Sequence, residues 1–472
     1  MPQQPATTVD RDQGLRDDAL SYPGQPPGIT VHAAGSWEGA AAADLRIVGD
    51  ERSVVTTRTT DPGRAAGQQL GSLRRGNASA VLNEIRASGT VSRSEIAARV
   101  GLSPATITKI IVELERAGCI TETAQAGPVP SRGRGRPRTP VTLNLERHRF
   151  LGVHVGMQRV TTGLVDLGGN LLALRARKHR GAAPRTVLTA ARRLVGELID
   201  QAGVRPADIV GYGACVGGWV SPESGTVRAF DGLGWRDVAF SDGLRITGLP
   251  APRVESTVRA LALTEARLAA QTGRRNILYL FVGNVIGCAH VVHGTIARGQ
   301  HNAAGIIDHV SCGVRGAVPC TCGRHDCLWA AASDAALAAA ARARGLLADG
   351  STIDDLISLT AQTGRQAKTA RSMLDQRATR VGTAVAALID IYDPDLAVIG
   401  GGDLATSDVH FELMVSAAAK RVGTAREPVP IQPAILVGPP GLVQGAATPA
   451  LDAFYADPLV DRPPPTPSTR CR

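Results

Sequence analysis

Residues 150–179, FLGVHVGMQRVTTGLVDLGGNLLALRARKH, decide the fold of the longer part of this chain. Apolar and β-branched residues fill three short runs, and glycines at Gly156 and Gly168 separate them, a pattern typical of consecutive β-strands joined by tight turns. A helical segment over residues 184–202 and another strand over residues 209–218 follow. Three strands, a crossover helix and a further strand predict an α/β fold.

The same succession of elements returns later in the chain. Residues 276–299, NILYLFVGNVIGCAHVVHGTIARG, contain two or three strands, and helical segments follow them. DLAVIGGG at residues 395–402 is one more strand that ends in glycines. Because the strand groups and their crossover helices occur twice, we expect a duplicated fold of two lobes with a cleft between them.

Three short helical segments precede these lobes. In residues 77–89 the apolar side chains recur with helical spacing. Residues 92–101 start with Ser92 and Glu95, the pair of a capping box, and residues 103–118 carry a stripe of Ile and Leu after a Ser-Pro start. A tight turn with glycine between the second and third segments predicts a helix-turn-helix.

The apolar stripe of the third segment determines which of its residues stay outside. Four of them lie at its N-terminal end, the end that a recognition helix inserts into the major groove of DNA. We expect these four residues to contact DNA: Ala105, Thr106, Thr108 and Lys109. A three-helix bundle that serves protein contacts is the alternative interpretation.

An arginine-rich loop follows the third helix. Residues 118–145 resemble two strands of a wing, and the loop between them alternates Arg with Gly and Pro, at Arg132, Arg134, Arg136 and Arg138. Such an extended cationic track can follow phosphates or enter a narrow minor groove. RGRP within it resembles the core of an AT-hook. A solvated linker would have the same composition.

Charge and composition favour a nucleic-acid-binding protein and argue against a membrane or disulfide-rich secreted one. The net charge is +10, and residues 72–150 hold thirteen Arg or Lys against six Glu, which gives 13 − 6 = +7. This local excess favours a nucleic-acid partner. Neither a secretory signal nor a run of eighteen apolar residues is present, so we expect a cytoplasmic protein without membrane contact. Most cysteines outside residues 312–327 lie in apolar segments, which argues against a disulfide framework.

The length of 472 residues allows two or three domains. We expect a disordered N-terminal arm, a winged helix-turn-helix, an effector and oligomerisation domain and a disordered tail. Their expected ranges are 1–70, 71–147, 148–456 and 457–472.

A cluster of metal-binding residue types lies in the second half of the chain. His309 joins Cys320, Cys322 and Cys327 in a set of three thiolates and one imidazole, which suits tetrahedral zinc. Four protein ligands leave no position for water, so the pattern predicts a structural site. Inert buried thiols are the alternative, and Cys312 is an alternative ligand.

Taken in order, the motifs LGVHVG…GLVDLGGN, GNVIGCAHVVHGTIARGQHNAAGIIDH, CTCGRHDC and DPDLAVIGGG resemble those of the ROK family of sugar kinases and transcriptional repressors. The resemblance extends from residue 73 to about residue 450. Kinase members lack the winged helix, so the architecture is similar to the xylose and N-acetylglucosamine repressors. The resemblance implies a two-lobed, actin-like (ribonuclease H-like) ATPase fold and a metal that holds the loop shaping the sugar pocket.

The kinase motifs of the family are changed in this chain. Thr257 stands where the resemblance places the catalytic Asp, and a hydroxyl cannot act as a base near pH 7. His154 and Gln158 replace the Asp and Thr of the first phosphate turn, and the second turn has become GNVIG. We therefore expect no phosphoryl transfer. A sugar kinase with a DNA-binding appendage and a scaffold with a basic linker are the rival hypotheses.

The sugar-binding motif is changed as well. Ile306 and Trp329 occupy positions where ligand-binding relatives carry Glu. The sequence thus predicts a repressor whose effector is not an ordinary hexose, or which has none, bound as a homodimer or homotetramer to a pseudo-palindromic operator in double-stranded DNA. Residues expected to form the effector site are Asp231, Glu255, Ser256, Arg259 and His309.

Overall fold

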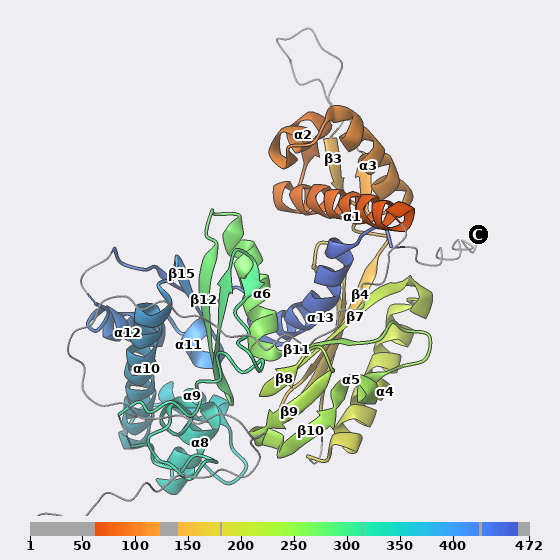
Figure 1. Cartoon of the computed structure of the whole chain (residues 1–472). Coiled ribbons are helices and arrows are strands. Elements are labelled where there is room, and N and C mark those ends of the chain that lie inside the picture. The colour runs from red at the N-terminus through yellow and green to blue at the C-terminus, as the bar shows by residue number, and fades with distance from the viewer. Residues whose placement is uncertain (1–61, 123–139, 180–181, 314, 424–426, 461–472) are drawn as a thin grey trace, which may run out of the picture. The chain divides into compact units, whose positions relative to one another are not determined.

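The computed structural model describes residues 62–122, 140–179, 182–313, 315–423 and 427–460. Two kinds of unit follow one another along the chain (Figure 1). The first is a winged helix, in which three helices pack with a sheet of strand order β1-β3-β2. Its elements are α1 (Pro62–Ser88), β1 (Val91–Ser92), α2 (Arg93–Val100), α3 (Pro104–Arg116), β2 (Ile120–Glu122) and β3 (Pro140–Leu143).

The helix ends of this unit form as the sequence predicts. The Glu95 amide donates to the Ser92 hydroxyl at 3.3 Å, and the Ser92 amide donates to the Glu95 carboxylate at 2.9 Å, so the capping box is present. Gly101 ends α2 with a φ of 72°, which favours glycine. β2 and β3 pair antiparallel, as expected for the two strands of a wing.

The first helix is longer than the apolar period indicates. It begins at Pro62, so residues 62–70, which we expected to belong to a disordered arm, are helical. Proline suits the first turn of a helix, and the Ala, Gln and Leu residues after it have high helix propensity. Helix propensity therefore lengthens this helix at its N-terminal end, whereas the apolar stripe alone predicts a start near residue 77.

The first lobe contains the three consecutive strands that the sequence predicts. Its sheet has the order β11-β7-β4-β5-β6, with β4, β5 and β6 antiparallel and β4, β7 and β11 parallel. The crossover helix α4 occupies the predicted residues, Pro184–Ala202. The strands are β4 (Arg149–Val155), β5 (Arg159–Val165), β6 (Leu171–Lys178), β7 (Ile209–Val216) and β11 (Arg253–Ser256).

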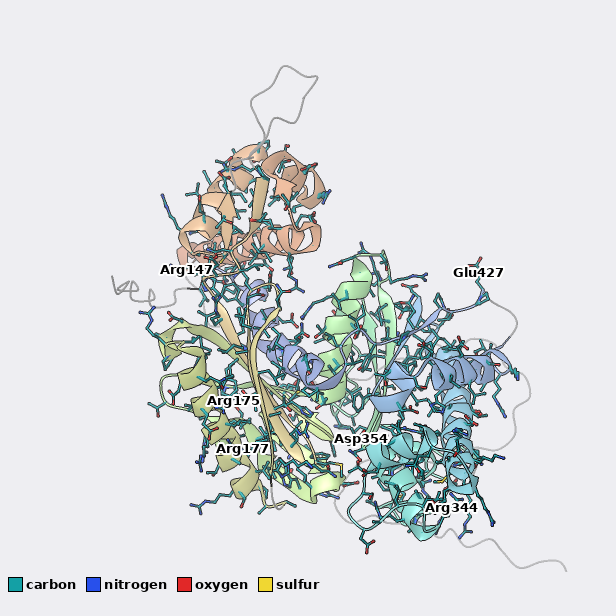
Figure 2. All side chains as sticks on the ribbon, turned by 180° about the vertical axis from the view of Figure 1, so that it is seen from behind. Arg147, Arg175, Arg177, Arg344, Asp354 and Glu427 are labelled. Carbon is teal, nitrogen blue, oxygen red and sulfur yellow. The ribbon has the colours of Figure 1, made fainter. Side chains whose placement is uncertain are left out.

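Two smaller features complete this lobe. Arg175 and Arg177 of β6, labelled in Figure 2, pair with Glu197 of α4, Arg177 at 2.7 Å. A second sheet, β10-β9-β8, extends toward the cleft side of the lobe and is followed by a short helix, α5 (Phe240–Leu244). The strands of this sheet are β8 (Trp219–Ser221), β9 (Thr226–Phe230) and β10 (Trp235–Ala239), with the 3₁₀ turn η2 (Asp231–Leu233) between β9 and β10. Another 3₁₀ turn, η1 (Pro206–Asp208), precedes β7.

The second lobe repeats the strand order of the first. Its sheet is β14-β13-β12-β15-β16, again with three antiparallel strands followed by parallel ones. The duplicated α/β fold is thereby confirmed. Its strands are β12 (Asn276–Val282), β13 (Ile286–Val292), β14 (Thr295–Ile296), β15 (Leu396–Gly400) and β16 (Ile431–Pro433). Its helices are α6 (Thr257–Ala270), α7 (Leu328–Ala332), α8 (Asp334–Ala343), α9 (Ile353–Thr360), α10 (Arg365–Tyr392), α11 (Gly402–Thr406) and α12 (Asp408–Ala419).

The last helix, α13 (Gly438–Ala456), lies directly on the sheet of the first lobe. Glycines make this close approach feasible, because a Cβ on Gly213 would lie 2.1 Å from the carbonyl oxygen of Ala446. The end of α13 also contacts the winged helix, where the Arg86 guanidinium lies 4.3 Å from the centre of the Tyr455 ring. None of the helices within the described residues combines the length and apolar character needed to span a bilayer.

Candidate functional site

Helix α3 presents the face that the sequence assigned to DNA. Its apolar stripe is buried, as predicted, and consists of Ile107, Ile110, Ile111 and Leu114. On the opposite face Ala105, Thr108 and Lys109 are exposed and Thr106 is half-buried. These four predicted residues therefore lie together at the N-terminal end of one helix.

The polar groups on this face retain hydrogen-bonding capacity. The hydroxyls of Thr106 and Ser103 lie 2.8 Å apart, and the Thr108 hydroxyl donates to the carbonyl of Pro104 at 2.9 Å. Each hydroxyl oxygen still has lone pairs that can accept from a base or from a protein-bound water. Lys109 forms no ion pair with any described residue. The face thus offers one free cation and two hydroxyls.

Several arginines of the winged helix are already neutralised. Three pairs join an arginine to a glutamate of the same unit: Arg74 with Glu113 at 2.7 Å, Arg93 with Glu122 at 2.5 Å and Arg99 with Glu84 at 2.8 Å. The uncompensated charge of this unit therefore depends strongly on the wing loop. The predicted phosphate contacts there, Arg132, Arg134, Arg136 and Arg138, lie outside the described residues.

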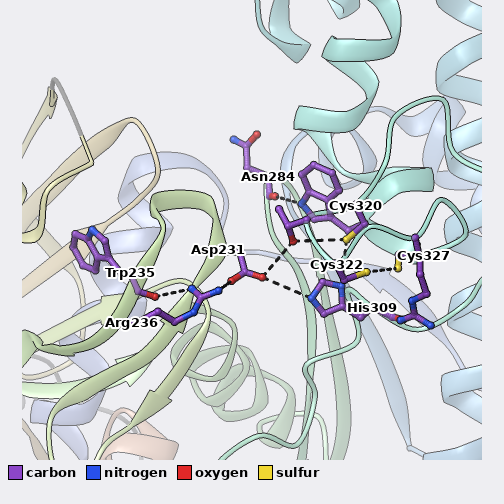
Figure 3. Close-up of polar contacts among 11 residues, drawn as sticks. Asp231, Trp235, Arg236, Asn284, His309, Cys320, Cys322 and Cys327 are labelled. Carbon is purple, nitrogen blue, oxygen red and sulfur yellow. Dashed lines mark hydrogen bonds and ion pairs between the residues drawn. The ribbon is translucent and has the colours of Figure 1, made fainter.

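A candidate metal centre lies in the second lobe, in the loop between β14 and α7 (Figure 3). One ligand atom from each of His309, Cys320, Cys322 and Cys327 lies within 4.8 Å of all the others. His309 Nδ1 is 3.2 Å from Cys320 Sγ, and the Sγ atoms of Cys322 and Cys327 are 3.3 Å apart. We call residues 309–327 the metal loop.

These distances fit tetrahedral zinc. With Zn–S bonds of about 2.3 Å, neighbouring sulfurs of a tetrahedron lie about 3.8 Å apart, so the four atoms need only small shifts to bind the ion. Hydrogen bonds from the backbone and guanidinium of Arg324 lower the pKa of Cys322, which favours the thiolate that a metal requires. Cys312 is not part of the set, since its thiol donates to the carbonyl of Asp326 at 3.3 Å.

Asp231 of η2 contacts the metal loop from the first lobe. Its carboxylate accepts from the Thr321 hydroxyl at 3.3 Å and lies 3.7 Å from His309 Nε2, while Arg236 holds its other oxygen at 2.7 Å (Figure 3). A carboxylate beside the free nitrogen of a metal-binding imidazole orients the ring. The loop is therefore fixed to the opposite wall of the cleft.

A cavity of about 250 Å³ opens beside the metal loop. Four of the five residues predicted for the effector site line it: Asp231, Ser256, Arg259 and His309. Ile306 and Trp329, which replace the glutamates of ligand-binding relatives, line it too. The structure thus brings together residues from both lobes that lie far apart in the sequence, for example Asp231 and Trp329, which are 98 positions apart.

Glu255 is the exception, because it is not among the residues that line this cavity. It is buried in an ion-paired group, with Arg298 at 2.5 Å and Arg259 at 3.3 Å. Buried carboxylates require such partners, so its burial has a structural explanation. Sequence reasoning also missed lining residues, above all Asp308, Trp219 and Phe230. Only the position of Asp308 beside His309 could have indicated one of them.

His154, at the first glycine turn of the cleft, gives a testable pH dependence. Its Nδ1 is buried without a hydrogen-bond partner among the described residues, although the ring as a whole is partly exposed. Burial lowers the pKa of His154 to about 4. The imidazole takes up a proton near pH 6.5 in the unfolded chain but only near pH 4 in the folded protein. The stability contributed by neutral His154 is therefore fully present above pH 6.5 and is lost as the pH falls toward 4.

Between pH 7 and pH 5 we expect the unmodified protein to lose up to roughly 2 kcal/mol more unfolding free energy than the His154→Gln variant. Urea unfolding of both proteins at the two pH values measures the difference. Equal losses in the two proteins would contradict the assigned protonation.

Comparison with known proteins agrees with this architecture. The sequence profile of the ROK family matches residues 150–448, and a winged helix-turn-helix DNA-binding profile matches residues 75–121. A transcriptional regulator of Mycobacterium tuberculosis is 29% identical over 403 residues, covering 81% of this chain and 86% of the regulator. The xylose repressor of Caldicellulosiruptor bescii is 25% identical over 331 residues, covering 68% of this chain and 81% of the repressor. The structure also aligns with the crystal structure of a ROK family transcriptional regulator, a homolog of the E. coli MLC protein, with a TM-score of 0.67 and 22% identity. The alignment covers 82% of this chain and 98% of that one, which shows a common fold.

Proposed function

We infer the role of this chain from the fact that it belongs to the ROK family and joins the family domain to a winged helix-turn-helix. It is a DNA-binding transcriptional regulator of the repressor type. The exposed N-terminal face of α3 carries this conclusion, because Lys109 and two threonine hydroxyls lie there above a fully buried stripe. We propose that Ala105, Thr106, Thr108 and Lys109 contact base edges and that the wing arginines contact phosphates.

Footprinting of the full-length protein on the region upstream of its own gene tests this function. A repressor should protect a defined site, and a dimer should protect two half-sites one helical turn, about 34 Å, apart. The expected operator is therefore pseudo-palindromic. Protection without a defined site, present only at low salt, would support a scaffold with a basic linker instead.

We further propose that the cleft has no kinase activity. Thr257 occupies the position of the catalytic base, and its side chain is buried at the start of α6. Asp334 is a second obstacle to phosphate binding. Its Oδ2 lies 3.6 Å from the position that a Cβ would take on Gly283 and 3.9 Å from the position that a Cβ would take on Gly402. Asp334 is held there by an ion pair with the buried Arg377, and a side chain fixed at these glycine turns leaves less room for the phosphate groups that such turns would otherwise bind.

A coupled assay of ADP release with ATP and a panel of hexoses is expected to show no sugar-dependent turnover. Thr257→Asp should not restore it, since Asp334 and the changed phosphate turns remain. Turnover by the unmodified protein would contradict the proposal and favour a kinase with a DNA-binding appendage.

The metal loop supports the effector domain in this proposal. His309, Cys320, Cys322 and Cys327 would hold one Zn²⁺, which supplies four fixed bonds and no catalytic position. Asp231 and Thr321 connect the loop to the first lobe. An effector in the neighbouring cavity changes DNA affinity only if it binds the free and DNA-bound forms unequally.

A further inference from the structure

The cavity beside the metal loop has an unusual number of aromatic walls. Aromatic residues make up 3% of the chain, and only four are tryptophans. Two of these four, Trp219 and Trp329, line this one cavity together with Phe230. Met157 and Ile306 add further apolar surface. The negative faces of aromatic rings attract cations as well as apolar groups.

A carboxylate with one unpaired oxygen lies in the same wall. Asp308 lines the cavity, and its Oδ1 is buried without a hydrogen-bond partner among the described residues. No Arg or Lys in the described ranges forms an ion pair with it. The amide of Trp329 donates to the carbonyl of Asp308 at 2.9 Å, so the carboxylate and an indole extend from neighbouring points of the backbone. A buried acceptor without a donor costs free energy, which a ligand donor can recover.

Side-chain donors in the cavity wall are mostly engaged elsewhere. Trp219 Nε1 donates to the carbonyl of His301 at 2.7 Å, and Trp329 Nε1 donates to that of Asn284 at 3.0 Å. The guanidinium of Arg259 is engaged by Glu255 and by the carbonyl of Asn302. Both indoles and the guanidinium are thus engaged, which leaves the Asn284 amide and the Ser256 hydroxyl as side-chain donors beside the acceptor of Asp308. A hexose suits it badly, because each ring hydroxyl both donates and accepts.

We propose that this cavity binds an organic cation, an ammonium group on an aromatic or other apolar body, with Asp308 as the counter-ion and the aromatic walls around the body. The inference rests on the proposed function, since it names the effector class of the regulator. An ammonium only donates, which matches the buried acceptor. The attraction of the cation to the aromatic faces adds to this charge-assisted bond.

Isothermal titration calorimetry of the full-length, zinc-loaded protein tests the proposal with three ligands that share one ring. We expect 2-phenylethylamine to bind at least about tenfold more tightly than the neutral 2-phenylethanol, and phenylacetate not to bind, because a bond to a charged partner exceeds a neutral one by about this factor. Glucose, xylose and N-acetylglucosamine are tested at the same concentrations and should not bind.

Asp308→Asn keeps the shape of the side chain and removes its charge, so amine affinity should fall at least about tenfold. Asp354→Asn is the matched control, because Asp354 is exposed in α9 of the same lobe (Figure 2) and lies outside the cavity. Unchanged zinc content verifies that Asp308→Asn is folded. In the unmodified protein, the comparison of amine with alcohol tests the charge requirement without any variant.

Several outcomes would overturn the proposal. Tighter binding of a hexose or of phenylacetate, equal binding of amine and alcohol, or no binding of 2-phenylethylamine would each exclude a cation site here. Amine binding that survives Asp308→Asn would exclude the assigned counter-ion. Operator protection in the absence of ligand is measured separately, so a failed cation site leaves the regulator intact, whereas a missing footprint refutes the regulator itself.

Discussion

Cys327→Ser is expected to abolish stoichiometric zinc binding and to lower the free energy of unfolding by about 4 kcal/mol. Cys327 is fully buried and occupies the N-cap position of α7, so its thiolate would connect a bound metal to a helix as well as to the loop. Without the metal, the loop loses the bonds that hold His309 against Asp231. Elemental analysis for zinc and thermal unfolding measure the two effects.

Hydrogen exchange should place the change in the metal loop. Protection is expected to decrease over residues 309–327 and to stay constant in the winged helix. Cys312→Ser is the matched control, because Cys312 lies in the same loop but outside the ligand set, and it should keep full zinc content. Zinc loss in Cys312→Ser, or zinc retained in Cys327→Ser, would mean that the ligand set is misassigned.

The double change Arg134→Ala and Arg136→Ala should weaken DNA binding on all sequences by roughly one hundredfold at moderate salt. Each lost phosphate contact reduces the slope of log affinity against log salt by about 0.9, so the pair should reduce it by roughly 2. Fluorescence anisotropy with operator and scrambled duplexes over a salt series measures both quantities. Lys178→Ala is the control, since this exposed lysine lies on β6 of the first lobe, away from α3.

Changes on α3 should have a different effect. Thr106→Val and Lys109→Ala are expected to cost about 1–3 kcal/mol on the operator and much less on the scrambled duplex, because base contacts discriminate between sequences. Equal losses on both duplexes from the wing and the helix variants would contradict the division into phosphate and base contacts.

The sequence by itself determined the features that arise from local spacing. The capping box of Ser92 and Glu95 and the Ile-Leu stripe of α3 set the helix-turn-helix, because both depend on contacts within a few residues. Repeated strand groups predicted two lobes, and the structure shows that their two sheets share one strand order. The close spacing of the cysteines in the metal loop likewise predicted a metal site with His309, since three ligands come from one short segment.

Only the tertiary structure decided what the cleft contains. Trp219 and Phe230 meet Asp308 because two lobes fold against each other, and Asp334 faces Gly283 and Gly402 because three separate segments converge. Glu255, predicted to face the cleft, instead pairs with Arg298, forty-three positions away (298 − 255). Local periodicity and capping fix helices and turns, but such contacts depend on how distant elements pack, and no short stretch of sequence encodes that packing.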